Sequence, residues 1–220
     1  MTAPSPMKAS VAERVSGLRQ LALIDPQAAQ DAAWAWFERV GAGLPAHSAE
    51  IELAELFAVG GPADVDGQTE GILVGWTDSY AGLDTTARVL VPPLRLLTTR
   101  LGVMPWLGKK FDKQAQRGTN TVTTSAVLMT AIAAPTYRLR RTDGRWEGFD
   151  MLNRVEASVV APETQVLVLD YETIGTNPWP INRIRDEAVQ IVPGTYLGAK
   201  LWHQADGYRL LAYWAARTQL

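Results

Sequence analysis

Cysteine is absent from the 220 residues of this chain. Its absence excludes disulfide bonds, thiol nucleophiles and thiolate metal ligands. Histidine is scarce as well: His47 and His203 lie far apart and form none of the short spacings that metal-binding histidines share. The signatures of phosphate loops, dinucleotide loops and the serine-hydrolase elbow are also missing. The sequence therefore predicts neither a metal site nor a cofactor.

Long apolar runs and an excess of one charge are lacking too. No apolar run approaches the roughly 20 residues that a membrane-spanning helix needs, and the first ten residues do not resemble a secretory signal. The chain has 21 basic and 23 acidic residues, and its densest basic cluster is the short run Arg138–Arg141. Bulk charge thus gives no argument for nucleic-acid binding. These features predict a soluble, cytoplasmic protein without a membrane span or a nucleic-acid partner.

Tryptophan is abundant by contrast, with eight residues against four phenylalanines. Its large ring fills cores, and its N–H group needs a hydrogen-bond partner when it is buried. Two interpretations follow. The tryptophans either fill the core and anchor surfaces, or two to four of them form the wall of a ligand cavity.

The first third of the chain has a helical pattern. Residues 1–6 are rich in proline and small polar residues, which predicts a disordered tail. Apolar residues recur at helical spacing over residues 7–23. The pattern of residues 51–59 fits either a third helix or a first strand. We therefore expect a helical N-terminal segment over residues 7–62 that packs on the rest of the protein.

Asp25 and Pro26 mark the start of a second helix, because aspartate accepts hydrogen bonds from free N–H groups and proline fits the first helical position. The helix carries three large aromatic residues in one turn, Trp34, Trp36 and Phe37. This aromatic turn either packs inside the protein or forms the seam of a homodimer.

From residue 63 onward the pattern is that of antiparallel strands. Pro193-Gly194 and Asp206-Gly207 are turn signals between apolar runs, and they lie about a dozen residues apart. The expected strands are 71–76, 87–91, 104–111, 119–134, 137–141, 146–149, 151–160, 165–171, 188–192, 196–202 and 208–214. Residues 94–102 are expected to form a short helical excursion and residues 172–185 a long loop. Sheets of this size commonly close into a barrel, and a barrel of about eight strands holds one small ligand. We therefore predict a β-barrel over residues 63–220.

Several polar residues on or beside these strands are candidates for proton transfer. An aspartate such as Asp186 has a raised pKa when it lies in an apolar cavity, and it then serves as a general acid or base. Tyr171 and Tyr196 are the other candidate catalytic residues. Side-chain alternation places Tyr196, Lys200 and Trp202 on one face of their strand, but it does not identify the face that lines the lumen.

Candidate ligand-binding residues are aromatic, polar or charged. Lys109, which follows Gly108, either projects into the barrel towards a carboxylate or lies on a solvated outer face. The glycine permits a bulge there. The predicted ligand-binding residues are Trp106, Lys109, Phe111, Asn120, Trp179, Arg183, Trp202 and Tyr213.

A series of short motifs also resembles a known family. In order along the chain these motifs are Trp106-x-Gly108-Lys109-x-Phe111, Asp170-Tyr171, Pro180-Ile181, Arg185-Asp186-Glu187 and Tyr196-Leu197-Gly198. The series is similar to uncharacterised bacterial proteins that combine a Gly-x-Trp-x-Gly segment with a small lipocalin-like barrel, over residues 66–205. The place of that segment reads Gly71-Ile-Leu-Val-Gly75-Trp76 here. The resemblance implies a mainly β, calycin-type antiparallel barrel for a hydrophobic ligand, and it implies no catalytic residues.

Two functions are consistent with these observations. The first is a binding protein that holds a small hydrophobic molecule, such as a lipid, a polyketide or a terpenoid, in the barrel. The second is a cofactor-independent cyclase, isomerase or dehydratase that acts on a hydrophobic substrate in the same cavity.

Overall fold

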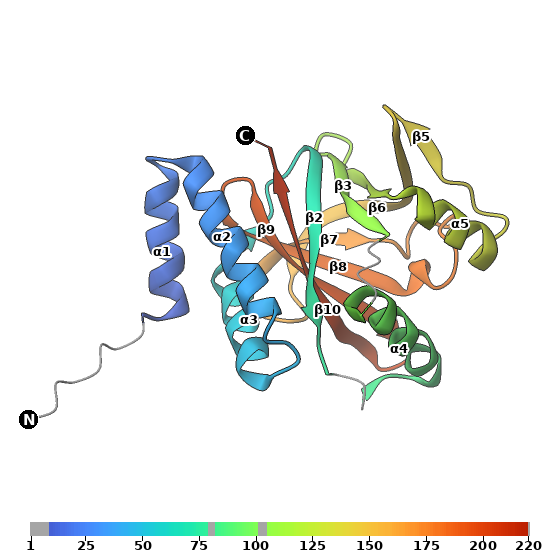
Figure 1. Ribbon diagram of the computed structural model, residues 1–220, viewed down its shortest axis with the longest axis horizontal. Helices are drawn as coiled ribbons and strands as arrows, with labels where there is room; N and C mark the ends of the chain where they lie inside the picture. The colour runs from blue at the N-terminus through green and yellow to red at the C-terminus, as the bar shows by residue number, and fades with distance from the viewer. Residues whose placement is uncertain (1–8, 79–81, 101–104, 220) are drawn as a thin grey trace, which may run out of the picture.

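The computed structural model describes residues 9–78, 82–100 and 105–219 (Figure 1). The tail predicted for residues 1–6 lies outside these ranges. The helices are α1 (Val11–Ala22), α2 (Pro26–Gly41), α3 (His47–Val59), α4 (Thr85–Arg100) and α5 (Thr124–Ala133), with a 3₁₀ turn at Ile181–Arg183. The strands are β1 (Gly61–Pro62), β2 (Gly67–Trp76), β3 (Trp106–Asp112), β4 (Arg117–Val122), β5 (Arg140–Thr142), β6 (Arg145–Ala157), β7 (Gln165–Asp170), β8 (Ile184–Val192), β9 (Thr195–Gln204) and β10 (Gly207–Thr218).

Among the described residues, eight antiparallel strands close into a barrel in the order of the chain: β2, β3, β4, β6, β7, β8, β9 and β10. Each strand pairs with the next, and β10 pairs with β2 to complete the circle. The short β1 and β5 pair with β8 and β6 outside this order. The predicted fold class, a mainly β antiparallel barrel with an N-terminal helical segment, is confirmed. Within the described ranges no helix is both long and apolar enough to cross a membrane.

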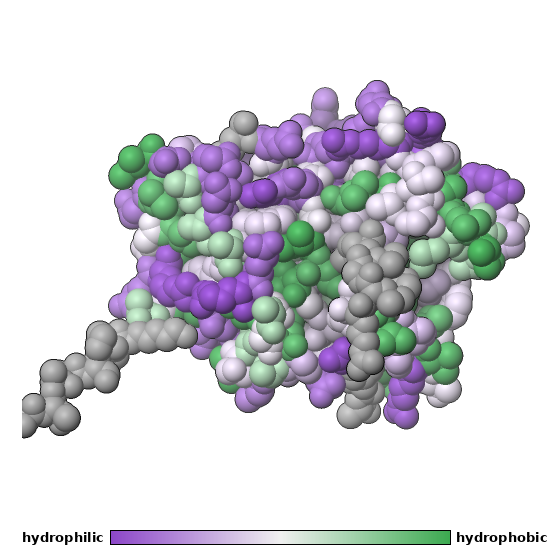
Figure 2. All heavy atoms as spheres, in the orientation of Figure 1, coloured by the Kyte–Doolittle hydropathy of each residue, from purple (hydrophilic) through white to green (hydrophobic). Residues whose placement is uncertain are grey.

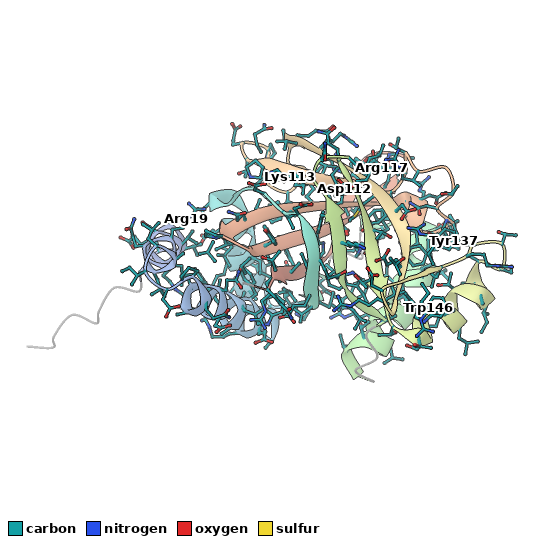
Figure 3. The ribbon with its side chains drawn as sticks, turned by 90° about the horizontal axis from the view of Figure 1, so that it is seen from above. Arg19, Asp112, Lys113, Arg117, Tyr137 and Trp146 are labelled. Carbon is teal, nitrogen blue, oxygen red and sulfur yellow. The ribbon has the colours of Figure 1, made fainter. Side chains whose placement is uncertain are left out.

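Side-chain caps mark the start of two of the three N-terminal helices, and the cap of α2 is the one that the sequence predicts. Ser10 and Glu13 form a reciprocal capping box at the start of α1. The side chain of Asp25 accepts a hydrogen bond from the Ala28 N–H group, and Pro26 occupies the first position of α2. The ambiguous segment 51–59 belongs to α3, so it is helical. The three helices lie together on one outer side of the barrel (Figures 1 and 3).

Two separate apolar layers explain why the C-terminal strands are apolar on both faces. The outer layer lies between the helices and the barrel wall, where Trp36 and Phe37 of α2 pack with Leu197 and Tyr213. The inner layer fills the lumen. The aromatic turn of α2 therefore packs inside the protein, at least through Trp36 and Phe37. Strands that are buried on both faces lose the polar–apolar alternation of a half-exposed strand.

Two segments predicted as strands are helical, one over its whole length and one in part. Residues 87–91 belong to α4, which starts where the Asp84 side chain accepts a hydrogen bond from the Ala87 N–H group. Within α4, Ala87 and Val91 are buried in the inner layer, while Pro92 and Pro93 face solvent. Solvent can satisfy the carbonyl groups that a proline leaves without an N–H partner, which makes the two prolines tolerable there.

The predicted strand 119–134 divides into β4 and α5. Thr123 stops the strand, because its side chain caps the helix by accepting a hydrogen bond from the Ala126 N–H group. The predicted loop 172–185 also differs at its end. β8 begins at Ile184, so the charged run Arg185–Glu187 lies within the barrel wall.

Candidate functional site

The lumen contains a cavity of about 350 Å³. α4 and α5 flank it through Leu90, Leu94, Ala126 and Met129. Its lining is mostly apolar and includes four of the eight tryptophans: Trp76, Trp106, Trp202 and Trp214. An apolar cavity with a few placed polar groups is the usual form of a small-molecule site.

The polar part of the lining is centred on Lys109, whose side chain is fully buried. Its Nζ atom donates three hydrogen bonds, to Asn120 Oδ1 at 3.0 Å, to the Tyr171 hydroxyl at 2.6 Å and to Asp186 Oδ2 at 2.9 Å. An ammonium group has three N–H donors, so all of them are used. These partners come from β4, from the end of β7 and from β8. Because Lys109 itself lies on β3, the cluster connects four strands of the barrel wall from the inside.

Lys200 on β9 completes the cluster. Its Nζ atom lies 3.0 Å from Asp186 Oδ1, and about a third (33%) of its side chain is exposed. The carboxylate of Asp186 thus lies between two ammonium groups and accepts hydrogen bonds from both. With two cations and one anion, the cluster has a formal charge of +1.

Burial changes the pKa values of these groups in different directions. Burial lowers the pKa of Lys109 to about 8, although the Asp186 carboxylate opposes the shift. Burial alone would raise the pKa of Asp186, but the two ammonium groups outweigh it and hold the pKa below its usual value. Burial raises the pKa of Tyr171 well above 10, and the charge of Asp186 adds to the effect. At neutral pH Asp186 is therefore a carboxylate and Tyr171 a neutral phenol.

The rings of Trp106 and Trp214 form the wall beside the cluster. They meet edge to face with centroids 5.8 Å apart, and Lys109 Nζ lies 4.9 Å from the Trp214 ring centroid. Two glycines make room for the rings: a Cβ atom on Gly71 would lie 2.3 Å from Trp106, and one on Gly198 would lie 2.0 Å from Trp214. The Nε1 atoms of Trp106 and Trp214 are buried and have no hydrogen-bond partner among the described residues.

A bulge in β3 brings Trp106 and Lys109 to the same side of the barrel wall. Regular alternation would place these residues, three positions apart, on opposite faces. The register with β4 shifts between Trp106 and Gly108, and Gly108 has a φ of +149°. A Cβ atom at this glycine would lie 2.2 Å from the Thr69 carbonyl oxygen, so the close approach of β2 requires glycine.

Six of the predicted site residues line this cavity: Trp106, Lys109, Asn120, Tyr171, Asp186 and Trp202. The Lys109 side chain points into the barrel and meets a carboxylate, one of the two alternatives that the sequence left open. Asp186 lies in the apolar cavity as considered from the sequence, but its pKa is lowered and not raised, because the neighbouring lysines outweigh burial.

The other predicted site residues lie away from the cavity. Phe111 and Tyr196 belong to the inner layer beyond it, and the Tyr196 hydroxyl donates to the Asp64 carbonyl oxygen. Tyr213 faces outward and packs edge to face on Phe57. The remaining two lie towards the surface: Arg183 donates to the His203 carbonyl oxygen, and the Trp179 side chain is exposed.

Sequence reasoning missed Lys200 and Trp214 as site residues. The signal for Lys200 was present, since it shares the alternating face of β9 with Trp202. Trp214 could be found only by deciding which face of β10 lines the lumen. Among the described residues no group of three or more histidine, aspartate or glutamate side chains is arranged to hold a metal ion.

Comparisons with known proteins add little to this geometry. No protein-family model matches the chain, and no curated protein matches it. A solved structure described as a protein from Thermomonospora curvata aligns with 73% of this chain and 80% of that chain, at 17% identity and a TM-score of 0.34. A similarity this distant supports no argument about function.

The lowered pKa of Lys109 predicts a rise in stability at alkaline pH. Between its folded pKa of about 8 and its ordinary value of 10.5, the unfolded chain binds more protons, so the free energy of unfolding rises with pH. Above pH 10 the raised pKa of Tyr171 reverses the sign, because the folded protein then holds the extra proton. Urea unfolding from pH 7 to 10 should show this rise in the wild type but not in Lys109→Met. An equal slope in both proteins would contradict the assignment.

Proposed function

We propose that the barrel binds one small, largely apolar molecule that has an acidic end group, such as a fatty acid or an acidic polyketide or terpenoid. The observation that carries the proposal is the lining of the cavity, in which one polar cluster of formal charge +1 lies within an otherwise apolar wall. We also propose that the chain is related to the lipocalin-like proteins of the Gly-x-Trp-x-Gly type.

The charge of the cluster favours an anionic end group. Asp186 neutralises one of the two lysines, and the remaining positive charge lies beside an apolar cavity where water screens it weakly. Lys109 uses all three of its N–H donors. Lys200 hydrogen-bonds only to Asp186 among the described residues, so it retains donors for a ligand. Lys200 is therefore the residue that would contact a carboxylate directly.

The two indole groups support an oxygen-bearing ligand independently. A buried donor without a partner costs about 1–3 kcal/mol. Trp106 Nε1 and Trp214 Nε1 are such donors, and both side chains line the cavity. A ligand oxygen placed near Lys200 and these indoles would accept hydrogen bonds. The apolar part of the ligand would then lie against Leu73 and Ile184.

Decanoate and decanol make a matched pair of probes, because they share an alkyl chain and differ in the end group. We expect isothermal titration calorimetry to show decanoate binding about tenfold more tightly than decanol, as one charge-assisted hydrogen bond would provide. Lys200→Met should weaken decanoate binding about tenfold and leave decanol binding unchanged, since only the acid uses the ammonium group.

The control for this experiment is Lys113→Met. Lys113 is exposed beside the β3–β4 turn, at the end of the strands away from α5 (Figure 3), and it pairs with Asp64. Its replacement should leave both affinities unchanged. Equal affinities of the wild type for acid and alcohol would refute the acidic end group, and binding of neither probe would refute the binding function for ligands of this class.

A second candidate function, a cofactor-independent enzyme, is favoured by the contact among Lys109, Tyr171 and Asp186. A lysine with a pKa of about 8 has a neutral fraction near physiological pH and can accept a proton. Compounds extracted from the purified protein would separate the two functions when they are returned to it. Unchanged recovery supports binding, whereas conversion that is lost in Tyr171→Phe supports the enzyme.

A further inference from the structure

The two helices that flank the cavity expose apolar side chains to solvent. On α5, Leu128 is 67% exposed and Ile132 is 76% exposed. On α4, Val89 and Leu96 are likewise exposed. Figure 2 shows hydrophobic side chains at the right edge of the molecule, where Figure 1 draws α5. We call the exposed surface of α4, α5 and residues 134–141 the α4–α5 face.

α5 is an unusual helix for a protein surface. Its sequence, TSAVLMTAIA, contains no charged residue. Ala126, Met129 and Thr130 line the cavity, so one side of the helix is already accounted for. A helix that is apolar all round normally has partners on every side. The outer side, with Leu128 and Ile132, has no such partner among the described residues.

The charge of the α4–α5 face differs from that of the rest of the chain. α4, α5 and residues 134–141 contain six arginines and no acidic residue, whereas the remaining chain has 15 basic and 23 acidic residues. Arg95 pairs with Asp78, and Arg140 pairs with Asp150. For Arg88, Arg138 and Arg141, no carboxylate of the described residues lies within ion-pair distance. These arginines therefore have charge available for an anionic partner.

We propose that the α4–α5 face docks on the surface of an anionic lipid bilayer. Exposed leucine, isoleucine and valine side chains gain free energy by entering the boundary between head groups and acyl chains, and nearby arginines attract anionic lipids. The exposed apolar side chains are spread over two helices, which suits a fluid lipid surface. If the cavity holds an apolar ligand, as proposed above, docking would also place the cavity next to a source of such molecules. The docking itself does not depend on that ligand.

Vesicle sedimentation tests the docking directly. The wild type should bind vesicles of phosphatidylcholine with 30% phosphatidylglycerol about tenfold more tightly than vesicles of phosphatidylcholine alone, and 0.5 M salt should remove the difference. Leu128→Glu/Ile132→Glu should reduce binding to the anionic vesicles about tenfold, because two charges replace the inserting side chains. Circular dichroism checks that this variant is folded.

The matched control is Leu23→Glu/Ile24→Glu. These two residues are 79% and 85% exposed, and they lie at the α1–α2 turn on the opposite side of the molecule (Figure 1). Their replacement adds the same charge and should leave vesicle binding unchanged. If both double variants lose binding equally, the loss reflects net charge and the proposed face is wrong.

A second variant, Arg88→Gln/Arg138→Gln, keeps the proposal falsifiable if the α5 variant does not fold. It should lower binding to anionic vesicles and leave binding to neutral vesicles unchanged. Absence of wild-type binding to anionic vesicles would overturn the proposal. So would a concentration-dependent dimer, seen by analytical ultracentrifugation without lipid, that Leu128→Glu/Ile132→Glu abolishes, because a second copy would then cover this face.

Discussion

Replacing Asp186 by alanine should lower the free energy of unfolding by about 3–5 kcal/mol, because the change leaves a buried charge without its counter-ion. Asp186 is fully buried and lies within hydrogen-bond distance of Lys109 and Lys200. Lys200 can turn towards solvent, since a third (33%) of its side chain is exposed. Lys109 cannot, and it would keep only the neutral Asn120 and Tyr171 as partners. Urea unfolding at pH 7 measures the loss.

A double variant separates the lost counter-ion from a general packing defect. Lys109→Met/Asp186→Leu removes both charges and retains apolar volume, so it should recover much of the stability that Asp186→Ala loses. Glu163→Ala is the control, since Glu163 is an exposed carboxylate, and it should leave the unfolding midpoint unchanged. If the double variant is less stable than Asp186→Ala, the ion pair itself stabilises the fold and the argument from desolvation is wrong.

The barrel could be predicted from local signals because its C-terminal half is built from short-range hairpins. The turns at Pro193-Gly194 and Asp206-Gly207 are the actual connections between β8, β9 and β10. The start of α2 was predictable for the same reason, as the Asp25 cap and Pro26 act within one turn of the helix. Signals of this kind need no knowledge of the rest of the fold.

The helices that flank the cavity could not be predicted in this way. The segments around Val89–Val91 and Val127–Met129 are rich in branched and apolar residues, which favour strands locally. Their helical form is set by what they cover: Val91 packs into the inner layer, and Met129 lines the cavity. The caps at Asp84 and Thr123 were present in the sequence, but tertiary packing decided the outcome.

The polar cluster was half predictable. Lys109 and Tyr171 could be singled out as polar residues in segments with a strand pattern, and Asp186 as a member of the charged run that precedes the last predicted strands. Their meeting depends on strands that are far apart in sequence, and on the bulge at Gly108 that alternation alone does not locate. Tyr213 was wrongly predicted to line the lumen. Neighbouring residues of a strand point to opposite faces, and Tyr213 lies on the face that packs against the outer helices.

Gly198→Val should destabilise the barrel by about 3 kcal/mol, at the upper end for overpacking, because the site has no room for a side chain. A Cβ atom there would lie 2.0 Å from Cε2 of Trp214. β9 cannot move aside, since Gly198 is paired with Ala188 on one neighbouring strand and with Trp214 on the other. Gly61→Val is the matched control: a Cβ atom at Gly61 meets nothing within 4 Å, so its effect should be within about 0.5 kcal/mol.

A second experiment exchanges side-chain volume between positions 198 and 214. It tests whether the clash with the Trp214 ring causes the loss of stability in Gly198→Val. Trp214→Val alone should cost about 3–5 kcal/mol through the cavity it leaves. In Gly198→Val/Trp214→Val the new side chain occupies part of that space, so the double variant should be about 2 kcal/mol more stable than the sum of the single losses predicts. If the stability losses of the two single variants are additive, glycine is required at position 198 by the backbone conformation and not by the nearby Trp214 ring. Because Trp214 forms the wall beside Lys109, the same double variant should also weaken decanoate binding, which links the small residue on β9 to the shape of the proposed site.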